Sequence, residues 1–257
     1  DCAFTILAIS GLLEGEAVFS SQTKDYLRDA VSEIKPQLVV LLGNNILPSP
    51  FISDMFVANT FRMIDEYIEI FESQKTYFTV LFGDYDAAAL YDKSSQIKRF
   101  MKSSYFVADI SENNNFITLE DNNRDYAGNY RLAILDKDKI GAYLYFIDTQ
   151  DQSPFQDEQK TWIENTSDKP SYFFSFLPLY RSYRIAEQNY FEIYFESNNI
   201  KGLFSGDSNK MLDYKSQNIH ILEIEKVASL EGDEVLRQYR AKKIVLLVDG
   251  GLLYEDY

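Results

Sequence analysis

Five short segments of the sequence each place a glycine or proline turn directly after a run of apolar residues. They are Ile9-Ser10-Gly11-Leu12-Leu13, Leu42-Gly43-Asn44-Asn45-Ile46, Phe82-Gly83-Asp84-Tyr85-Asp86, Phe176-Leu177-Pro178 and Ser205-Gly206-Asp207-Ser208-Asn209. In open α/β sheets, ligands bind at the carboxyl ends of strands, where these turns would lie if the apolar runs are strands. The five turns are therefore the candidate functional site.

The histidine and cysteine content limits the chemistry that such a site could perform. The chain has one cysteine, Cys2, which excludes an intrachain disulfide and a zinc site built from cysteines. It has one histidine, His220, so no site can use two imidazoles. His220 lies outside the five turns, and we expect it to be an ordinary strand residue. A serine nucleophile at Ser10 or Ser205 would lack a neighbouring base and the group that orients it.

The hydrophobic periodicity predicts the elements that would position these turns. Strands are expected at residues 5–9, 37–42, 76–82, 113–119, 129–135, 142–148, 171–177, 202–205, 219–224 and 244–248. Helices are expected at residues 20–34, 53–71, 87–102, 155–165, 185–197 and 230–242. Nearly continuous apolar strands that alternate with helices indicate an α/β protein whose sheets are buried on both faces. Because no linker or repeat interrupts the pattern, we expect one domain over residues 1–257.

The charge balance argues against polyanionic partners. Forty acidic and 25 basic residues give a formal net charge of −15. Such a surface repels phosphate backbones, so we expect no nucleic-acid partner. No apolar run approaches the roughly 20 residues that span a bilayer, so we also expect no membrane span.

Two features of the sequence bear on location. The numbering begins at Asp1, as it would after removal of a leader peptide. Asn165-Thr166-Ser167 is a sequon for N-glycosylation, with Asn165 as the acceptor. From these signals we expect a secreted protein rather than a cytoplasmic one.

In order and spacing, the five turns resemble the five conserved blocks of the calcineurin-like metallophosphoesterases. Other segments resemble the purple-acid-phosphatase-like branch: Gly128-Asn129-Tyr130, residues 144–148, the helix with Gln159 and Trp162, and residues 200–206. The likeness extends from Phe4 to about Glu225. It implies a four-layer α/β sandwich in which two facing mixed β-sheets are flanked by helices.

The resemblance also implies a pair of divalent metals, yet this sequence has replaced their ligands. The ligand positions of the first block fall on Gly11 and Leu13, and the bridging aspartate falls on Asn44. The catalytic histidine falls on Tyr85, and two further histidine ligands fall on Phe176 and Asn209. Asp84 and Asp207 stand where the family has an asparagine and a histidine. Since histidine and carboxylate ligands retain such metals, the resemblance implies that the dinuclear centre is lost.

The remaining oxygen ligands predict a site for a single cation at this position. If the implied fold holds, Asn44, Asp84 and Asp207 converge and offer oxygen ligands that suit Mg²⁺ or Ca²⁺. The simpler alternative is that the two aspartates cap helix N-termini or pair with Lys210.

We therefore expect a catalytically inactive metallophosphoesterase-like protein that acts by binding a protein or a small ligand. It needs no cofactor, or at most one Mg²⁺ or Ca²⁺. The alternative is a weak, divergent metal-dependent phosphohydrolase that uses the residual single-metal site. A third possibility is a purely structural or interaction domain whose pocket is filled by side chains.

Overall fold

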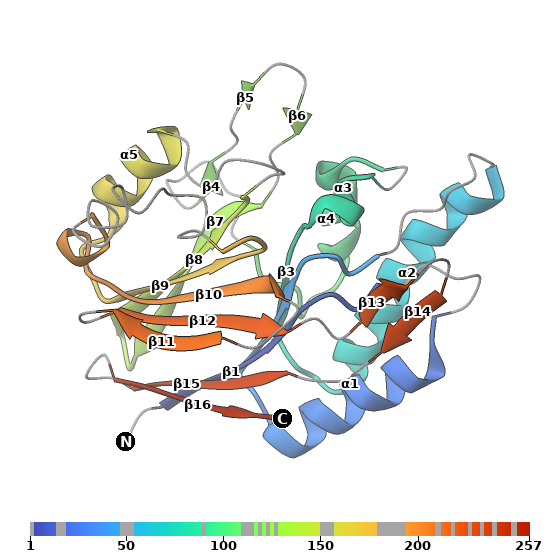
Figure 1. The fold of residues 1–257 in the computed structure, drawn as a ribbon, viewed down its shortest axis with the longest axis horizontal. Helices are drawn as coiled ribbons and strands as arrows, with labels where there is room; N and C mark the ends of the chain where they lie inside the picture. The colour runs from blue at the N-terminus through green and yellow to red at the C-terminus, as the bar shows by residue number, and fades with distance from the viewer. Residues whose placement is uncertain are drawn as a thin grey trace.

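The computed structural model describes most of the chain, and the fold is built from those residues. They are residues 3–13, 19–46, 54–88, 91–108, 116–117, 120–121, 124–125, 128–149, 157–178, 194–208, 212–216, 219–225, 228–231, 234–237, 241–247 and 251–257. Within these ranges, two sheets face each other and helices cover their outer faces (Figure 1). This is the expected four-layer α/β sandwich.

The first sheet has five strands in the described residues, in the order β16-β15-β1-β2-β3. Their bounds are β1 Ala3–Ile9, β2 Leu38–Leu42, β3 Phe78–Leu81, β15 Lys242–Leu247 and β16 Leu252–Asp256. β1, β2 and β3 run parallel, whereas β15 pairs antiparallel with both β1 and β16. The parallel trio therefore brings the first three turns to the same edge of the sheet.

The second sheet has seven described strands in the order β11-β12-β10-β9-β8-β7-β4. Their bounds are β4 Phe116–Ile117, β7 Asn129–Asp136, β8 Lys139–Ile147, β9 Ser171–Ser175, β10 Ile200–Ser208, β11 Leu212–Ser216 and β12 Ile219–Glu225. β8, β9, β10 and β12 are parallel to one another, and β7 and β11 are antiparallel to their neighbours. The parallel strands carry the last two turns at their carboxyl ends.

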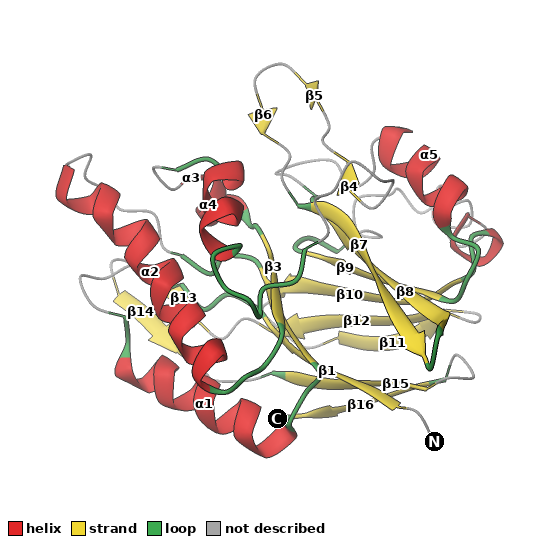
Figure 2. Ribbon diagram, turned by 180° about the vertical axis from the view of Figure 1, so that it is seen from behind, coloured by secondary structure: helices red, strands yellow, loops and turns green. Residues whose placement is uncertain are grey.

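The helices cover the outer faces of the sandwich (Figure 2). They are α1 Ser21–Ile34, α2 Asp54–Ser73, α3 Asp84–Ala88, α4 Lys93–Phe100 and α5 Asp157–Thr166. The side chains of α1, α2 and α4 pack with the first sheet, around Leu41, Tyr67 and Phe78. Those of α5 pack with the second sheet, around Tyr145 and Trp162. Ser20 caps α1, because its hydroxyl accepts the N–H of Thr23.

The layer between the sheets is apolar and rich in aromatic rings. Residues of the first sheet such as Ile6 and Val40 pack there against the second sheet. Phe146, Phe174 and Phe204 stack in sequence across β8, β9 and β10, with ring centroids 5.4 Å and 4.9 Å apart. The high aromatic content therefore serves the central core.

Several sequence predictions of elements were wrong or incomplete. The helix expected at residues 230–242 is instead a hairpin of β13 Ala228–Glu231 and β14 Glu234–Arg237, in which Glu231 pairs with Glu234. The two connecting residues are Gly232-Asp233, a dipeptide that favours hairpins over helices. The helix expected at 87–102 is two helices, α3 and α4, and the strands β11 and β16 were not predicted.

Two expected elements are described only in part. Of the strand expected at 113–119, the structure describes Phe116–Ile117 as β4, which pairs with β7. Of the helix expected at 185–197, residues 194–197 are helical, and the rest lies outside the described residues. The short strands β5 Glu120–Asp121 and β6 Arg124–Asp125 form a separate hairpin.

Candidate functional site

The five turns meet at one end of the sandwich, as the sequence predicted. The N–H of Gly11 donates to the carbonyl of Gly43 over 3.0 Å, and the N–H of Leu13 donates to the carbonyl of Asn44 over 2.9 Å. Gly206 lies so close to Ser10 and Leu42 that a Cβ there would collide with both. Turns from both sheets therefore pack directly against one another.

Gly43 permits the closest of these approaches. A Cβ on Gly43 would lie 2.5 Å from Cδ2 of Phe176 and 2.9 Å from the backbone nitrogen of Gly83. Gly43 also has a φ of +90°, which residues other than glycine rarely adopt. The ring of Phe176, which is 4% exposed, thus lies against the turns of β2 and β3.

Asn44 is buried at the centre of the turns, and its side-chain oxygen already accepts a hydrogen bond. Its Oδ1 accepts the backbone N–H of Tyr85 over 3.0 Å. A Cβ on Gly83 would collide with the same Oδ1, so the amide is confined between the two turns. Leu13 and Asn44 both have positive φ angles, 51° and 52°. The Leu13 side chain is 3% exposed and adds an apolar group to this end.

The aspartates of the turns differ in their surroundings. Asp84 is exposed and begins the first turn of α3, while Tyr85, which follows it, is half-buried. The backbone of Asp207 belongs to the end of β10. The side chain of Asp207 and all of Asn209 lie outside what the structure describes, as does Lys210.

Asp86 is the acidic residue that the structure places at the heart of the site, and the sequence pattern alone does not distinguish it from Asp84. Its Oδ1 accepts the N–H groups of Asn45 (3.0 Å) and Ile46 (2.8 Å), and its Oδ2 accepts that of Gly83 (2.9 Å). Burial raises the pKa of Asp86 to about 6, although these backbone N–H groups act to lower it. Asp86 ties the turn of β2 to the turn of β3.

A buried ion pair flanks the turns and was also missed from the sequence. Nζ of Lys93, at the start of α4, lies 3.0 Å and 2.9 Å from the two carboxylate oxygens of Asp148, just after β8. Asp148 is 4% exposed and Lys93 is 8% exposed. A Cβ on Gly128 would lie 3.6 Å from Asp148 and 3.8 Å from Phe82, so the pair is next to the end of β3. The feature of the sequence that could have identified this pair is the position of Asp148, an aspartate directly after an apolar strand.

Asn129 and Gln159 lie in segments that resemble the purple-acid-phosphatase-like branch. Together they form a hydrogen-bonded clamp on the backbone of Asp148. Nε2 of Gln159 donates to Oδ1 of Asn129 over 2.8 Å and to the carbonyl of Asp148 over 3.0 Å. Oδ1 of Asn129 also accepts the N–H of Asp148 over 3.0 Å. The clamp joins β7, the end of β8 and α5, so its role is to hold these elements together.

His220 lies far from the turns along its strand. It pairs with Gly202, near the start of β10, and its ring lies 6.5 Å from that of Tyr254. The turn with Asp207 is at the other end of β10. Among the described residues there is no group of three or more histidine, cysteine or acidic side chains that could hold a metal ion.

Comparison with known proteins shows the fold. No protein-family model and no curated protein matches the sequence. Among solved structures, a dimetal phosphatase from Danio rerio superposes with a TM-score of 0.59 at 12% identity, over 94% of this chain and 95% of that one. GAP50, described as the anchor in the inner membrane complex of Plasmodium, superposes with a TM-score of 0.60 at 11% identity, over 100% of this chain and 84% of that one.

The chain has a metallophosphoesterase-like fold. Identities this low establish the architecture alone. The two similar structures are described in different terms, one as an enzyme and one as an anchor, so the shared fold assigns neither role to this chain. None of its described helices is both long and apolar enough to cross a membrane.

Proposed function

We propose that this protein is a catalytically inactive relative of the metallophosphoesterases that acts by binding a protein or a small ligand. The observation that carries the proposal is that side chains of the protein itself fill the centre of the candidate site. The ring of Phe176 lies against Gly43, and the amide oxygen of Asn44 accepts a backbone hydrogen bond. A phenyl ring and an engaged amide oxygen offer little to a divalent metal.

The donor chemistry of the described residues does not fit a pair of divalent metals. Gly11 has no side chain, and those of Leu13 and Phe176 are apolar and buried. Asp86 is buried, but its two oxygens accept hydrogen bonds that tie the turns together. We derive no catalytic step through a metal pair at this site, and the assignment to the purple-acid-phosphatase-like branch stays a prediction.

The fold of GAP50 offers a precedent for the proposed kind of role, because that protein is described as an anchor. A metallophosphoesterase-like sandwich is a rigid platform of two packed sheets, whether or not it holds metals. Function depends on the site and the surface rather than on the sandwich itself.

Metal binding and hydrolysis measured together test this proposal. The full chain, purified without chelators, is titrated calorimetrically with Mn²⁺, Mg²⁺ and Ca²⁺ and assayed with an aryl phosphate monoester and diester. We expect no stoichiometric binding of Mn²⁺ and no hydrolysis above that of the Asp84→Asn/Asp207→Asn double variant. Metal-dependent hydrolysis that this double variant loses would overturn the proposal in favour of the divergent phosphohydrolase. Binding of one Ca²⁺ or Mg²⁺ without hydrolysis would leave an inactive protein with a residual cation site.

We also propose that the protein is secreted, on the basis of its sequon. Asn165 is exposed near the end of α5, where a glycan would meet solvent. Expression in a glycosylating host should give a protein whose mass falls on treatment with an N-glycosidase. The Asn165→Gln variant should lack this mass difference, and an unglycosylated wild-type protein would remove the support for secretion.

A further inference from the structure

A cleft between the two sheets opens at the end of the sandwich opposite the five turns. Its larger chamber has a volume of about 490 Å³ and apolar walls that include Phe4, Leu38, Val107, Leu132, Ile134 and Leu144. Phe4 and Leu38 stand at the starts of β1 and β2, whereas the turns follow the ends of these strands. The cleft is therefore separate from the candidate site described above.

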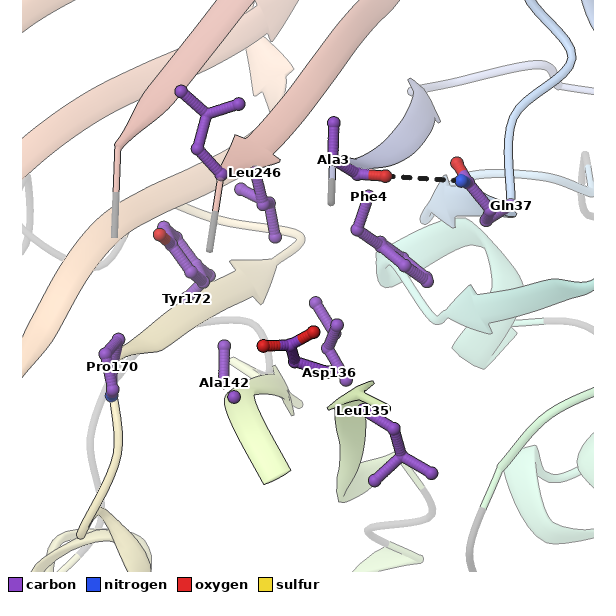
Figure 3. A pocket seen from close by; sticks show the side chains of 12 residues that line it. Ala3, Phe4, Gln37, Leu135, Asp136, Ala142, Pro170, Tyr172 and Leu246 are labelled. Carbon is purple, nitrogen blue, oxygen red and sulfur yellow. Dashed lines mark hydrogen bonds between the residues drawn. The ribbon is translucent and has the colours of Figure 1, made fainter. Parts of the chain in front are cut away.

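A smaller chamber of about 200 Å³ lies beside the larger one. The two chambers share Phe4, Gln37 and Ile134 in their walls. Figure 3 shows the smaller chamber, with the rings of Phe4 and Tyr172 from the two sheets and the carboxylate of Asp136 on the β7 side. The larger chamber has the size and apolar character of small-molecule sites rather than of a flat protein interface.

The polar side chains in the wall of the larger chamber are mostly satisfied within the protein. Oε1 of Gln37 accepts the N–H of Thr5 over 2.7 Å, and its Nε2 donates to the carbonyl of Ala3 over 3.4 Å, as Figure 3 shows. The hydroxyl of Thr76 donates to the carbonyl of Gln74 over 3.2 Å. A ligand inside this chamber would therefore meet a largely apolar wall.

Lys75 supplies the charge of this chamber. It is exposed, follows α2 with a φ of 52°, and is the charged residue in the lining of the larger chamber. Within the ranges that the structure describes, its ammonium group forms no ion pair. Asp136 is the charged residue in the lining of the smaller chamber. An anionic group is thus favoured at the Lys75 end of the cleft and opposed at the Asp136 end.

We propose that this cleft binds a single-chain amphiphile with a carboxylate head, such as a free fatty acid. The hydrocarbon chain lies in the larger chamber, where it loses its contact with water. The carboxylate lies beside Lys75, whose positive charge complements it despite the net charge of −15 on the whole chain. At ordinary ionic strength distant acidic residues are screened, whereas a carboxylate beside Lys75 lies within one Debye length of its ammonium group. The proposal does not depend on the loss of phosphatase chemistry.

Calorimetric titration of the full chain with two surfactants of equal chain length tests the proposal. Dodecanoate and dodecylamine, both below their critical micelle concentrations, share a tail and differ in the sign of the head charge. We expect saturable binding of dodecanoate with one molecule per chain and at least roughly tenfold weaker binding of dodecylamine. The Lys75→Glu variant should reverse this preference. The Lys98→Glu variant, with the same charge change on the exposed side of α4, should not.

A variant that fills the larger chamber with a bulky side chain tests whether the ligand binds inside it. Leu132 is half-buried on β7, lines the larger chamber and packs on the face of the sheet that meets the first sheet, so Leu132→Trp should fill the chamber and abolish the binding of dodecanoate. An unchanged melting temperature of this variant establishes that it is folded.

Three results would overturn the proposal. They are equal binding of both surfactants that Lys75→Glu leaves unchanged, full dodecanoate binding in a folded Leu132→Trp variant, and binding to phosphatidylserine vesicles without any binding of free dodecanoate. The last would make the cleft a membrane-facing patch. The Asp84→Asn/Asp207→Asn variant should bind dodecanoate normally, so failure here is distinguishable from failure of the proposed function.

Discussion

At the scale of single residues, Asp86 is the acidic group on which the candidate site depends for its shape. Its carboxylate accepts three backbone N–H groups from the turns of β2 and β3. An asparagine at this position keeps one oxygen but presents an NH₂ group to donors that need an acceptor. We expect Asp86→Asn to lower the free energy of unfolding by about 1–3 kcal/mol at pH 7. Urea denaturation measures this, and an unchanged midpoint would show that the turns do not need the carboxylate.

The raised pKa of Asp86 predicts how its contribution varies with pH. Because the pKa is about 6 in the folded chain and 3.8 in the reference state, the folded state binds more protons between these values. Stability contributed by Asp86 is therefore highest below about pH 4 and falls as the pH rises to 6, by roughly 3 kcal/mol.

Comparison with the Asp86→Asn variant isolates this pH dependence from that of other groups. Burial also raises the pKa of Glu223, to about 7, and this group titrates in both proteins. The difference in unfolding free energy, wild type minus variant, should fall between pH 4 and pH 6. A difference that stays constant or rises would contradict the prediction.

Gly43 and Phe176 form a second local constraint that can be tested. We expect Gly43→Ala to cost at least about 2 kcal/mol, because the methyl group meets Phe176 and the backbone has a positive φ. In the Gly43→Ala/Phe176→Ala double variant, the cost should be smaller than the sum of the two single costs. Strict additivity in chemical denaturation would show that the ring does not confine Gly43.

At the scale of elements, the Lys93–Asp148 pair joins α4 to the carboxyl end of β8. Removing one member of a buried pair leaves an uncompensated charge, so Lys93→Met and Asp148→Asn should each cost about 3–5 kcal/mol. The double variant should cost much less than the sum. A matched control is the exposed pair of Lys243 and Glu255, where Lys243→Met should cost below about 1 kcal/mol. Equal costs at the two pairs, in thermal or urea unfolding, would refute the distinction.

At the scale of the whole molecule, the net charge of −15 should oppose folding at low salt. The Debye length is about 30 Å at 0.01 M salt and about 8 Å at 0.15 M, so added salt screens repulsion across the chain. We expect the melting temperature to rise between these salt concentrations, with NaCl and KCl acting alike. A fall in melting temperature would mean that attractive pairs outweigh the repulsion.

The sequence by itself determined the alternation of strands and helices, the four-layer sandwich through its resemblance, and the meeting of five turns at one end. The alternation and the turns follow from periodicity and from turn residues, which act over a few positions of the chain, whereas the sandwich follows from the resemblance alone. It also determined that no site could use two histidines, since a residue count needs no structure. The hairpin at 228–237 was missed because apolar residues around Leu230 and Leu236 suit either a helix or two strands.

Only the tertiary structure decided how the turns are held and where else a ligand could enter. Asp86 binds backbone groups 40 and 41 residues away, and Lys93 binds a carboxylate 55 residues away. The cleft near Lys75 is lined by strands of both sheets, from Phe4 to Leu144. Such contacts join segments far apart in the chain, so their partners depend on how the sheets pack and not on any local pattern.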